Sequence, residues 1–169
     1  GNKGYIGIGT DSYPVYNFKS DFWEYDPTTD NWTQKADFPA TPRYTPIGFS
    51  IDTKGYVGTG WNQVNPLFKD MWQYDQVNNT WQQKANFPGP VRQAGVGFVI
   101  GNKAYAGFGH NNSNTLKDFY VYNDTTDVWT AVAGFPGASR LHAFYFALNG
   151  KGYIGAGCVS YPFYNFVND

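Results

Sequence analysis

Three arginines with nearly constant spacing are the clearest candidates for ligand chemistry in this chain. Arg43, Arg92 and Arg140 lie 49 and then 48 residues apart. A guanidinium is a planar fork of donors that suits a carboxylate, so these side chains could bind an acidic ligand. The alternative is structural, because identical placement in three copies also favours bracing of neighbouring modules through backbone carbonyl groups.

Aromatic side chains gather in four segments of variable length and form the second group of candidate binding residues. The segments are 11–20, 61–69, 110–117 and 158–168. Tyr and Trp combine an apolar ring with a polar tip, which suits sugars and protein partners alike. The alternative is that the rings fold back over the sheets as satellite cores. The candidates are Tyr13, Tyr16, Phe18, Trp61, Phe68, Tyr161, Tyr164 and Phe166.

The sequence carries no signature of catalysis or metal binding. His110 and His142 are the only histidines, too few and too scattered for a metal site. Cys158 is the only cysteine. The Gly-x-Gly pairs fall inside strand-like segments and not in a phosphate-binding loop. We therefore expect no catalytic residue, no metal and no cofactor, and predict that the chain is not an enzyme.

The elements that must position these residues belong to a repeat with a period near fifty residues. Each copy contains a tyrosine and a tryptophan separated by six residues. A repeat of this length is one supersecondary unit, and each copy needs a neighbour to bury its apolar face. We expect each Tyr–Trp pair to be wedged against the next module. The pairs are Tyr25–Trp32, Tyr74–Trp81 and Tyr122–Trp129.

One copy of the repeat reads as four short antiparallel strands. Its segments 95–100, 103–109, 118–122 and 128–132 alternate or are apolar, and a Gly-Asn pair turns the chain between the first two. Four short strands with one aromatic motif per unit are typical of a propeller blade. An aspartate begins each third strand, and we expect it to cap the loop or to accept hydrogen bonds from backbone N–H groups. These aspartates are Asp21, Asp70, Asp118 and Asp169.

The pattern resembles the Kelch repeat, whose blades carry a glycine pair after the second strand and a Tyr–Trp pair across the third and fourth. All three Tyr–Trp pairs match that spacing, and the resemblance covers essentially the whole chain. The glycine pair departs from the family, since it is Gly-x-Gly and only its second member aligns. This variant is similar to secreted bacterial Kelch-type proteins. The aligned glycines are Gly9, Gly60, Gly109 and Gly157.

The resemblance implies an all-β fold: a partial Kelch-type β-propeller of about three four-stranded antiparallel blades plus flanking strands of further blades. We treat 1–169 as one propeller segment, with a blade part at 1–39, blades at 40–88 and 89–136, and a blade part at 137–169. A closed propeller needs about four to eight blades. We therefore expect the remaining blades to come from a longer chain or from other copies.

The two ends of the chain resemble each other closely. Residues 1–21 match 149–169 across an offset of 148 positions. A three-blade super-repeat, which would give a six-bladed ring in two rounds, explains the match. The alternative is that neighbouring repeats drifted apart and two of them stayed alike.

Composition limits the partners. The net charge is −1 and no Lys/Arg run occurs, so we do not expect nucleic acid as a partner. No apolar stretch approaches the roughly 18 residues of a membrane helix, so no membrane span is expected. A single cysteine rules out an internal disulfide but is compatible with bacterial export. With the resemblance, this predicts a secreted or cell-surface bacterial protein.

We predict a non-catalytic binding or scaffold module that recognises a protein or a glycan through its blade loops. One alternative is a structural component that assembles into a ring or filament through open blade faces. The other, implied by the resemblance, is a sugar-active enzyme of the mutarotase or galactose-oxidase-like type. The copper site of such an oxidase needs a Tyr–Cys crosslink and histidine ligands, which this chain does not supply.

Overall fold

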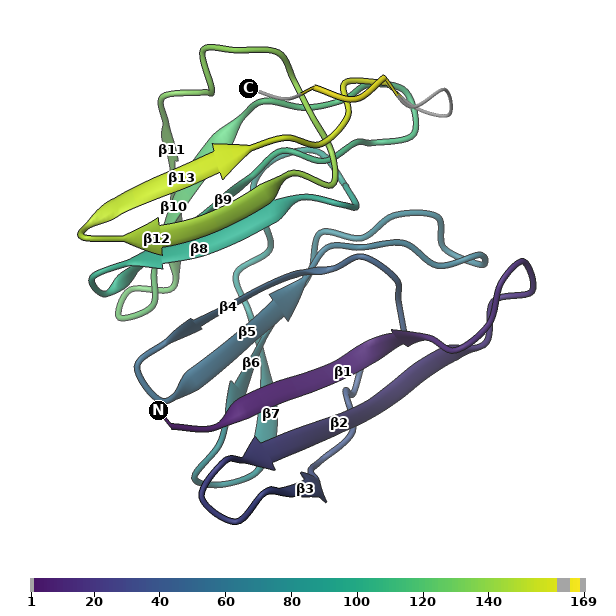
Figure 1. Cartoon of the computed structure of the whole chain (residues 1–169), viewed down its shortest axis with the longest axis vertical. Helices are drawn as coiled ribbons and strands as arrows, with labels where there is room; N and C mark the ends of the chain where they lie inside the picture. Colours follow the sequence, from purple (N-terminus) through teal and green to yellow (C-terminus); the bar gives the residue numbers. More distant parts are fainter. Residues whose placement is uncertain (1, 161–164, 168–169) are drawn as a thin grey trace.

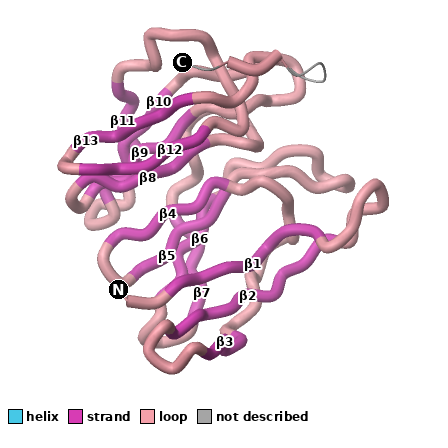
Figure 2. Tube along the Cα trace, viewed as in Figure 1, coloured by secondary structure: helices cyan, strands magenta, loops and turns pink. Residues whose placement is uncertain are grey.

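Thirteen strands and no helix make up the described part of the chain, residues 2–160 and 165–167. In this computed structural model the strands form four antiparallel sheets that follow one another along the sequence (Figures 1 and 2). The all-β prediction is confirmed, and two of the sheets have four strands. The sheets do not close on themselves. The predicted Tyr161, Tyr164 and Asp169 lie outside the described residues.

Within each sheet, strands that are consecutive in sequence are hydrogen-bonded neighbours. Sheet 1 contains β1 (Gly4–Thr10), β2 (Phe18–Asp26) and β3 (Asn31–Gln34). Sheet 2 contains β4 (Ile47–Ile51), β5 (Lys54–Gly58), β6 (Met71–Asp75) and β7 (Thr80–Lys84). Sheet 3 contains β8 (Val96–Ile100), β9 (Lys103–Gly107), β10 (Phe119–Asn123) and β11 (Val128–Val132). Sheet 4 contains β12 (Phe144–Leu148) and β13 (Lys151–Gly155).

Tight turns join the first and second strands of sheets 2, 3 and 4. They use residues that tolerate positive φ, namely Asp52 (52°), Gly101 (60°) and the pair Asn149 (51°) and Gly150 (72°). Such residues match the twist of a two-residue hairpin, and this is why the strands on either side pair without a register shift.

Sheets 2 and 3, and likewise sheets 3 and 4, contact each other mainly through their first strands. β4 packs against β8, and β8 packs against β12. Glycine permits this approach: a Cβ built on Gly97 of β8 would lie 2.6 Å from Cγ2 of Ile47 in β4. The core between sheets 2 and 3 therefore starts at Ile47, which is fully buried with Met71, Phe87 and Ala106.

All three Tyr–Trp pairs are direct cross-strand partners, but the pairs of sheets 2 and 3 pack against the preceding sheet. The Trp81 ring lies 5.0 Å from that of Phe22, and its Nε1 donates to the Ala36 carbonyl at 2.9 Å. Trp129 donates to the Ala85 carbonyl in the same way, at 3.2 Å. The expected wedging against the next module is wrong in direction, because the connection leaving each sheet runs beside the outer hairpin of the following one.

In sheets 2 and 3, one turn residue ties the Tyr–Trp hairpin to the connection that leaves the preceding sheet. The Tyr74 hydroxyl donates to Asn79 Oδ1 at 2.9 Å, and the Ala36 backbone N–H donates to the same oxygen at 2.8 Å. Asp127 plays the same part for Tyr122 and Ala85, at 2.7 and 3.0 Å. A single side-chain oxygen thus joins two sheets at each of these interfaces.

Candidate functional site

The loops that follow β1, β5, β9 and β13 lie together at one end of the molecule, and the tight turns of sheets 2, 3 and 4 lie at the other end (Figure 1). We call the first the loop end. It contains residues 11–17, 59–70, 108–118 and 156–160. Loops on a rigid scaffold are where binding residues most often lie, so the loop end is the first place to look for a site.

Backbone bridges fix the base of three of these loops. Trp61 exchanges hydrogen bonds with Tyr44 in the connection that enters sheet 2, at 2.7 and 2.9 Å. His110 and Cys158 make the equivalent bridges in sheets 3 and 4. The aligned glycine lies just before each bridge, and Gly60 has a φ of 100°. A Cβ there would lie 2.9 Å from the Tyr44 carbonyl oxygen, so the position requires glycine.

The remaining aligned glycines divide into two kinds. Gly109 and Gly157 repeat the geometry of Gly60, with φ values of 88° and 94°. Gly9 differs, because it lies inside β1, where a Cβ would meet no other atom within 4 Å. The sequence motif therefore marks a loop base in three sheets and a strand interior in sheet 1.

Arg43 is fully buried beneath the loop of sheet 2. Its Nη1 and Nη2 donate to the two carboxylate oxygens of Asp70, at 2.5 and 3.0 Å, and Nη1 also lies 3.2 Å from the Thr59 carbonyl oxygen. The guanidinium stacks 3.9 Å from the ring centre of Phe68. The predicted aromatic residue Phe68 thus covers the arginine and lies outside the exposed part of the loop end.

Arg92 repeats this arrangement with Asp118, at 2.8 and 2.7 Å, and with the Phe108 carbonyl at 3.0 Å. Arg140 is equally buried and donates to the Ala156 carbonyl at 3.2 Å. The arginines brace the connections through carbonyl groups, and no atom of them is exposed for a ligand. Asp70 and Asp118 pair with arginine side chains, where the sequence predicted loop caps or acceptors of backbone N–H groups.

Four of the predicted aromatic residues form one cluster at the loop end. The Tyr16 ring stacks on Phe18 (5.7 Å, 18°) and meets Trp61 edge-on (5.1 Å, 70°). Tyr13 lies 5.8 Å from Tyr16 and is 83% exposed. Tyr44 joins the cluster at 6.2 Å. The base of the cluster is a satellite core, and Tyr13 and Tyr44 give it an exposed aromatic rim.

A polar pocket of about 210 Å³ lies at the loop end of sheets 3 and 4. Its walls are hydroxyl and amide groups with one histidine: His110, Asn112, Ser113, Asn114, Thr115, Val159 and Ser160. Burial, with the His142 charge adding to it, lowers the pKa of His110 below 6.5. The neutral form of the imidazole therefore predominates at pH 7, and no Asp, Glu, Lys or Arg side chain lines the pocket.

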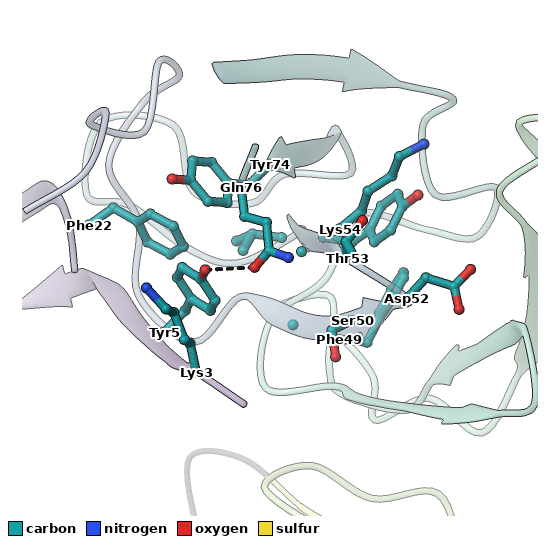
Figure 3. A pocket seen from close by; sticks show the side chains of 14 residues that line it. Lys3, Tyr5, Phe22, Phe49, Ser50, Asp52, Thr53, Lys54, Tyr74 and Gln76 are labelled. Carbon is teal, nitrogen blue, oxygen red and sulfur yellow. Dashed lines mark hydrogen bonds between the residues drawn. The ribbon is translucent and has the colours of Figure 1, made fainter. Parts of the chain in front are cut away.

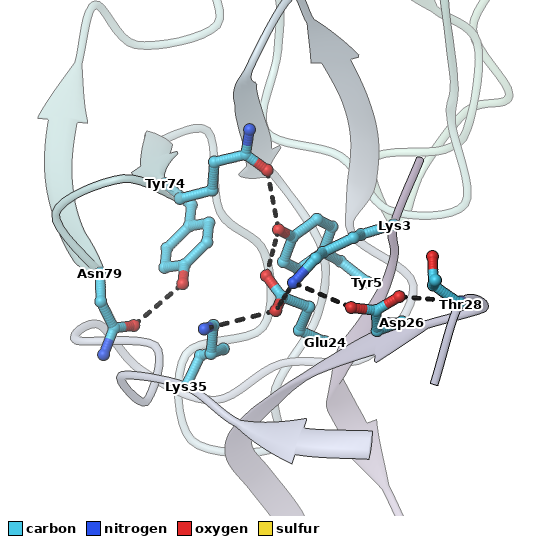
Figure 4. A network of polar contacts seen from close by, with 9 residues as sticks. Lys3, Tyr5, Glu24, Asp26, Thr28, Lys35, Tyr74 and Asn79 are labelled. Carbon is cyan, nitrogen blue, oxygen red and sulfur yellow. Dashed lines mark hydrogen bonds and ion pairs between the residues drawn. The ribbon is translucent and has the colours of Figure 1, made fainter. Parts of the chain in front are cut away.

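A charged network lies at the other end of sheet 1 (Figure 4). Burial raises the pKa of Glu24, but hydrogen bonds from Lys3 (2.8 Å) and Tyr5 (2.5 Å) and the charge of Lys35 outweigh it and hold that pKa below 4.5. Burial and the Glu24 carboxylate raise the pKa of Tyr5. The network keeps Glu24 ionised and fixes the position of the Tyr5 ring.

Metal binding finds no support at either end. Within residues 2–160 and 165–167, no group of three or more His, Cys, Asp or Glu side chains could hold a metal ion. Over the same residues, no helix is long and apolar enough to cross a membrane.

Comparison with known proteins gives a fold but no family. No protein-family model matches the sequence, and no curated protein matches it. The solved structure of YjhT is similar, with a TM-score of 0.77 and 20% sequence identity. The match covers 93% of this chain and 56% of YjhT, so the chain spans little more than half the length of that relative.

The structure thus sorts the predicted site residues by position. Tyr13, Tyr16, Phe18 and Trp61 come together. Phe166, which is 76% exposed, forms a backbone bridge with Cys158 in the segment that follows β13. Sequence reasoning missed Tyr44, because it lies outside the variable loops. Its position in the sequence could have identified it, because Tyr44 follows Arg43 directly and its backbone pairs with Trp61 at the base of the loop.

Proposed function

We propose that the four sheets are consecutive blades of a Kelch-type β-propeller. The succession of sheets joined through β4, β8 and β12 supports this, as do the repeated Tyr–Trp hairpins. The similarity to YjhT over nearly the whole chain adds to it. In this proposal the blade boundaries are those predicted from the repeat, at 1–39, 40–88, 89–136 and 137–169.

On this scaffold the chain is a non-catalytic binding module, and the ligand that fits best is a glycan. The observation that carries this is the aromatic cluster, in which Tyr13 and Tyr44 expose ring surface around a fixed Tyr16–Trp61 base. Flat rings with polar tips suit the mixed apolar and hydroxyl surface of a sugar. The uncharged hydroxyl and amide pocket at the same end offers donors and acceptors for further hydroxyl groups.

A location outside the cell or on its surface belongs to the same proposal. Glycans are plentiful there, and the single cysteine makes the fold independent of a disulfide.

A glycan array followed by calorimetric titration tests the function. Saturable binding of one glycan class by the intact protein, with no change in the sugar over hours, is the expected result. Release of a product from the sugar would favour the enzyme alternative. Capture of a protein partner on a surface other than the aromatic cluster, with an empty array, would overturn the glycan assignment.

Self-assembly is a second candidate, supported by the exposed face of sheet 4. Phe144, Phe146 and Leu148 of β12 are 66%, 42% and 54% exposed, an unusual amount of apolar surface for three residues of one strand. Light scattering over a hundredfold range of protein concentration separates this from a monomeric binding module.

A further inference from the structure

The aromatic cluster and the polar pocket lie on one row of loops. The loops that follow β1, β5, β9 and β13 are arranged along the loop end in the order of their sheets (Figure 1). The cluster joins the loops of sheets 1 and 2, and the loops of sheets 3 and 4 line the pocket. The two candidate binding surfaces are therefore neighbours in this row, with the connection that enters sheet 3 between them.

Polar contacts link the two surfaces through Gln93 in that connection. Thr45 follows Tyr44 of the cluster in sequence, and its Oγ1 donates to Gln93 Oε1 at 3.1 Å. The backbone of Gln93 exchanges hydrogen bonds of 3.1 and 3.0 Å with His110, which lines the pocket. Gln93 is half-buried, and its Nε2 can donate to a ligand hydroxyl group. A polar group thus lies between the aromatic rings and the pocket.

Backbone hydrogen bonds hold this path rigid. The Ala94 N–H donates to the Thr45 carbonyl at 3.1 Å, and the His142 N–H donates to the Ala94 carbonyl at 3.1 Å. The connections that enter sheets 2, 3 and 4 are thereby tied to one another in turn. A surface that is already fixed loses little conformational entropy when a long ligand binds across it.

The charges along the path suit an uncharged ligand. No Asp, Glu, Lys or Arg side chain lines the pocket. Lys19, which follows the cluster residue Phe18, is paired with Asp11 at 2.8 Å. All three arginines of the chain are fully buried, so none can bind the carboxylate or sulfate group of an acidic sugar. The chemistry that the path offers is ring stacking and hydrogen bonding to hydroxyl groups.

A groove of about 350 Å³ between sheets 1 and 2 does not belong to this path (Figure 3). Its walls include Tyr5 and Gln76, and it lies beside the tight turn between β4 and β5, at the end opposite the loops. Asp52 and Lys54 bring charges of both signs to it. The groove shares no residue with the cluster or the polar pocket, so its side chains can serve as controls.

We propose that the loop end binds a linear, uncharged oligosaccharide that runs from the aromatic cluster across Gln93 to the polar pocket. Stacked sheets lie about 10 Å apart, so a ligand that reaches from the cluster to the pocket is roughly 20 Å long, or about four sugar units. Its first units stack on Tyr13 and Tyr44, which are 83% and 40% exposed, and its last hydroxyl groups reach Asn114. This inference rests on the proposed glycan binding and adds the length, the charge and the course of the ligand.

Oligosaccharides of one to six units test the length. The probes are cello-oligosaccharides, malto-oligosaccharides and N-acetylated chito-oligosaccharides, all of them uncharged linear chains, titrated calorimetrically into the intact protein. In one of these series the affinity should rise by at least about tenfold from the disaccharide to the tetrasaccharide and then level off. The rise is expected because the contact with the pocket becomes intramolecular once the cluster holds the other end of the chain.

Two variants distinguish the ends of the path. Tyr13→Ala should weaken the disaccharide and the tetrasaccharide alike, by about tenfold. Asn114→Ala should weaken only the tetrasaccharide, because a disaccharide at the cluster does not reach the pocket. Its melting temperature should stay the same, since Asn114 bonds to Asn111 through its backbone. Gln76→Ala is the matched control: it removes an amide of the groove and should leave the binding of both chains unchanged.

Three results would overturn the inference. A monosaccharide that binds as tightly as the tetrasaccharide would show that one short site suffices, and it would leave the proposed glycan function intact. Equal effects of Asn114→Ala on both chain lengths, or weaker binding by Gln76→Ala, would place the ligand away from this path. Absence of binding in all three series by a folded protein is the third, and an empty glycan array would overturn the proposed function as well.

Discussion

Arg43 and Asp70 form a two-pronged ion pair in which the guanidinium has no exposed surface and the carboxylate keeps 21% of its own. The two hydrogen bonds measure 2.5 and 3.0 Å. Arg43 lies in the connection that enters sheet 2, and Asp70 lies just before its third strand. The pair therefore attaches an irregular segment to the sheet, and Arg92 and Asp118 repeat the device in sheet 3.

Loss of one of these arginines should destabilise the fold strongly. Arg43→Ala leaves a partly buried carboxylate unpaired and opens space beneath Phe68, and we expect a loss of about 3–5 kcal/mol in the free energy of unfolding. Lys19→Ala is the matched control, because Lys19 pairs with Asp11 on the surface and should cost under about 1 kcal/mol. Urea unfolding at pH 7 measures both, and equal losses would contradict the role assigned to Arg43.

The same pair should make stability sensitive to acid. Burial raises the pKa of Asp70, but the hydrogen bonds from Arg43 and Trp72 and the Arg43 charge outweigh it and hold the pKa below 3.8. A depressed folded-state pKa means that the stabilisation is complete above the unfolded value and is lost as the pH falls through the folded value.

Asp70→Asn removes the titrating group of this pair. The variant should therefore be less stable than the unmodified protein at pH 7, and the difference should shrink as the pH falls below about 3.8. Urea titrations at several pH values between 7 and 2 give the comparison. A difference that stays constant over this range would show that Asp70 acts through its shape and not through its charge.

The interface tryptophans should differ sharply from the exposed one, although all three occupy the same place in the repeat. Trp81 packs on Phe22 and donates to Ala36, whereas Trp32 is 53% exposed. We expect Trp81→Ala to cost about 3 kcal/mol, and Trp32→Ala about 1 kcal/mol or less, because the latter loses mainly its contact with Tyr25. Chemical denaturation of the two variants decides this. Equal losses in the two variants would mean that the interface between sheets 1 and 2 contributes little to the free energy of unfolding.

These comparisons show what the sequence could predict. A period near fifty residues, the Tyr–Trp spacing and the turn glycines indicated the all-β class and the strands, because each is a local pattern. The direction of the Tyr–Trp packing was not predictable, since it depends on the path of the connection that carries Ala36. The Arg43–Asp70 pair was missed for the same reason: its members are 27 residues apart, and only the folded connection brings them together.

The candidate site was predictable in part. Loop composition identified Tyr13, Tyr16 and Trp61, but it could not show that they share one cluster, because they belong to two different sheets. It also included Phe68, which the fold uses to cover Arg43.

The aromatic cluster makes the glycan proposal directly testable. Tyr13→Ala changes an exposed rim residue, so binding of the glycan found on the array should weaken about tenfold while the melting temperature stays the same. Trp32→Ala is the matched control, because it removes an exposed aromatic ring that lies outside the loop end. Equal binding by the unmodified protein and Tyr13→Ala would place the ligand elsewhere.

A strained residue at the end of β13 should allow the protein to be stabilised. Ala156 has a φ of 52°, in the left-handed region that costs a residue with a Cβ about 1 kcal/mol. Its side chain is exposed and its carbonyl accepts a hydrogen bond from Arg140, which glycine would keep. Ala156→Gly should therefore raise the free energy of unfolding by up to about 1 kcal/mol.

Ala147→Gly is the control: Ala147 is also exposed but lies within β12, where glycine should lower stability by about 0.5–1 kcal/mol. We expect urea unfolding to show a gain in stability for Ala156→Gly and a loss for Ala147→Gly. A loss of stability in both variants would show that the turn after β13 gains nothing from glycine, and that the Gly-x-Gly form of the motif is as favourable here as two adjacent glycines.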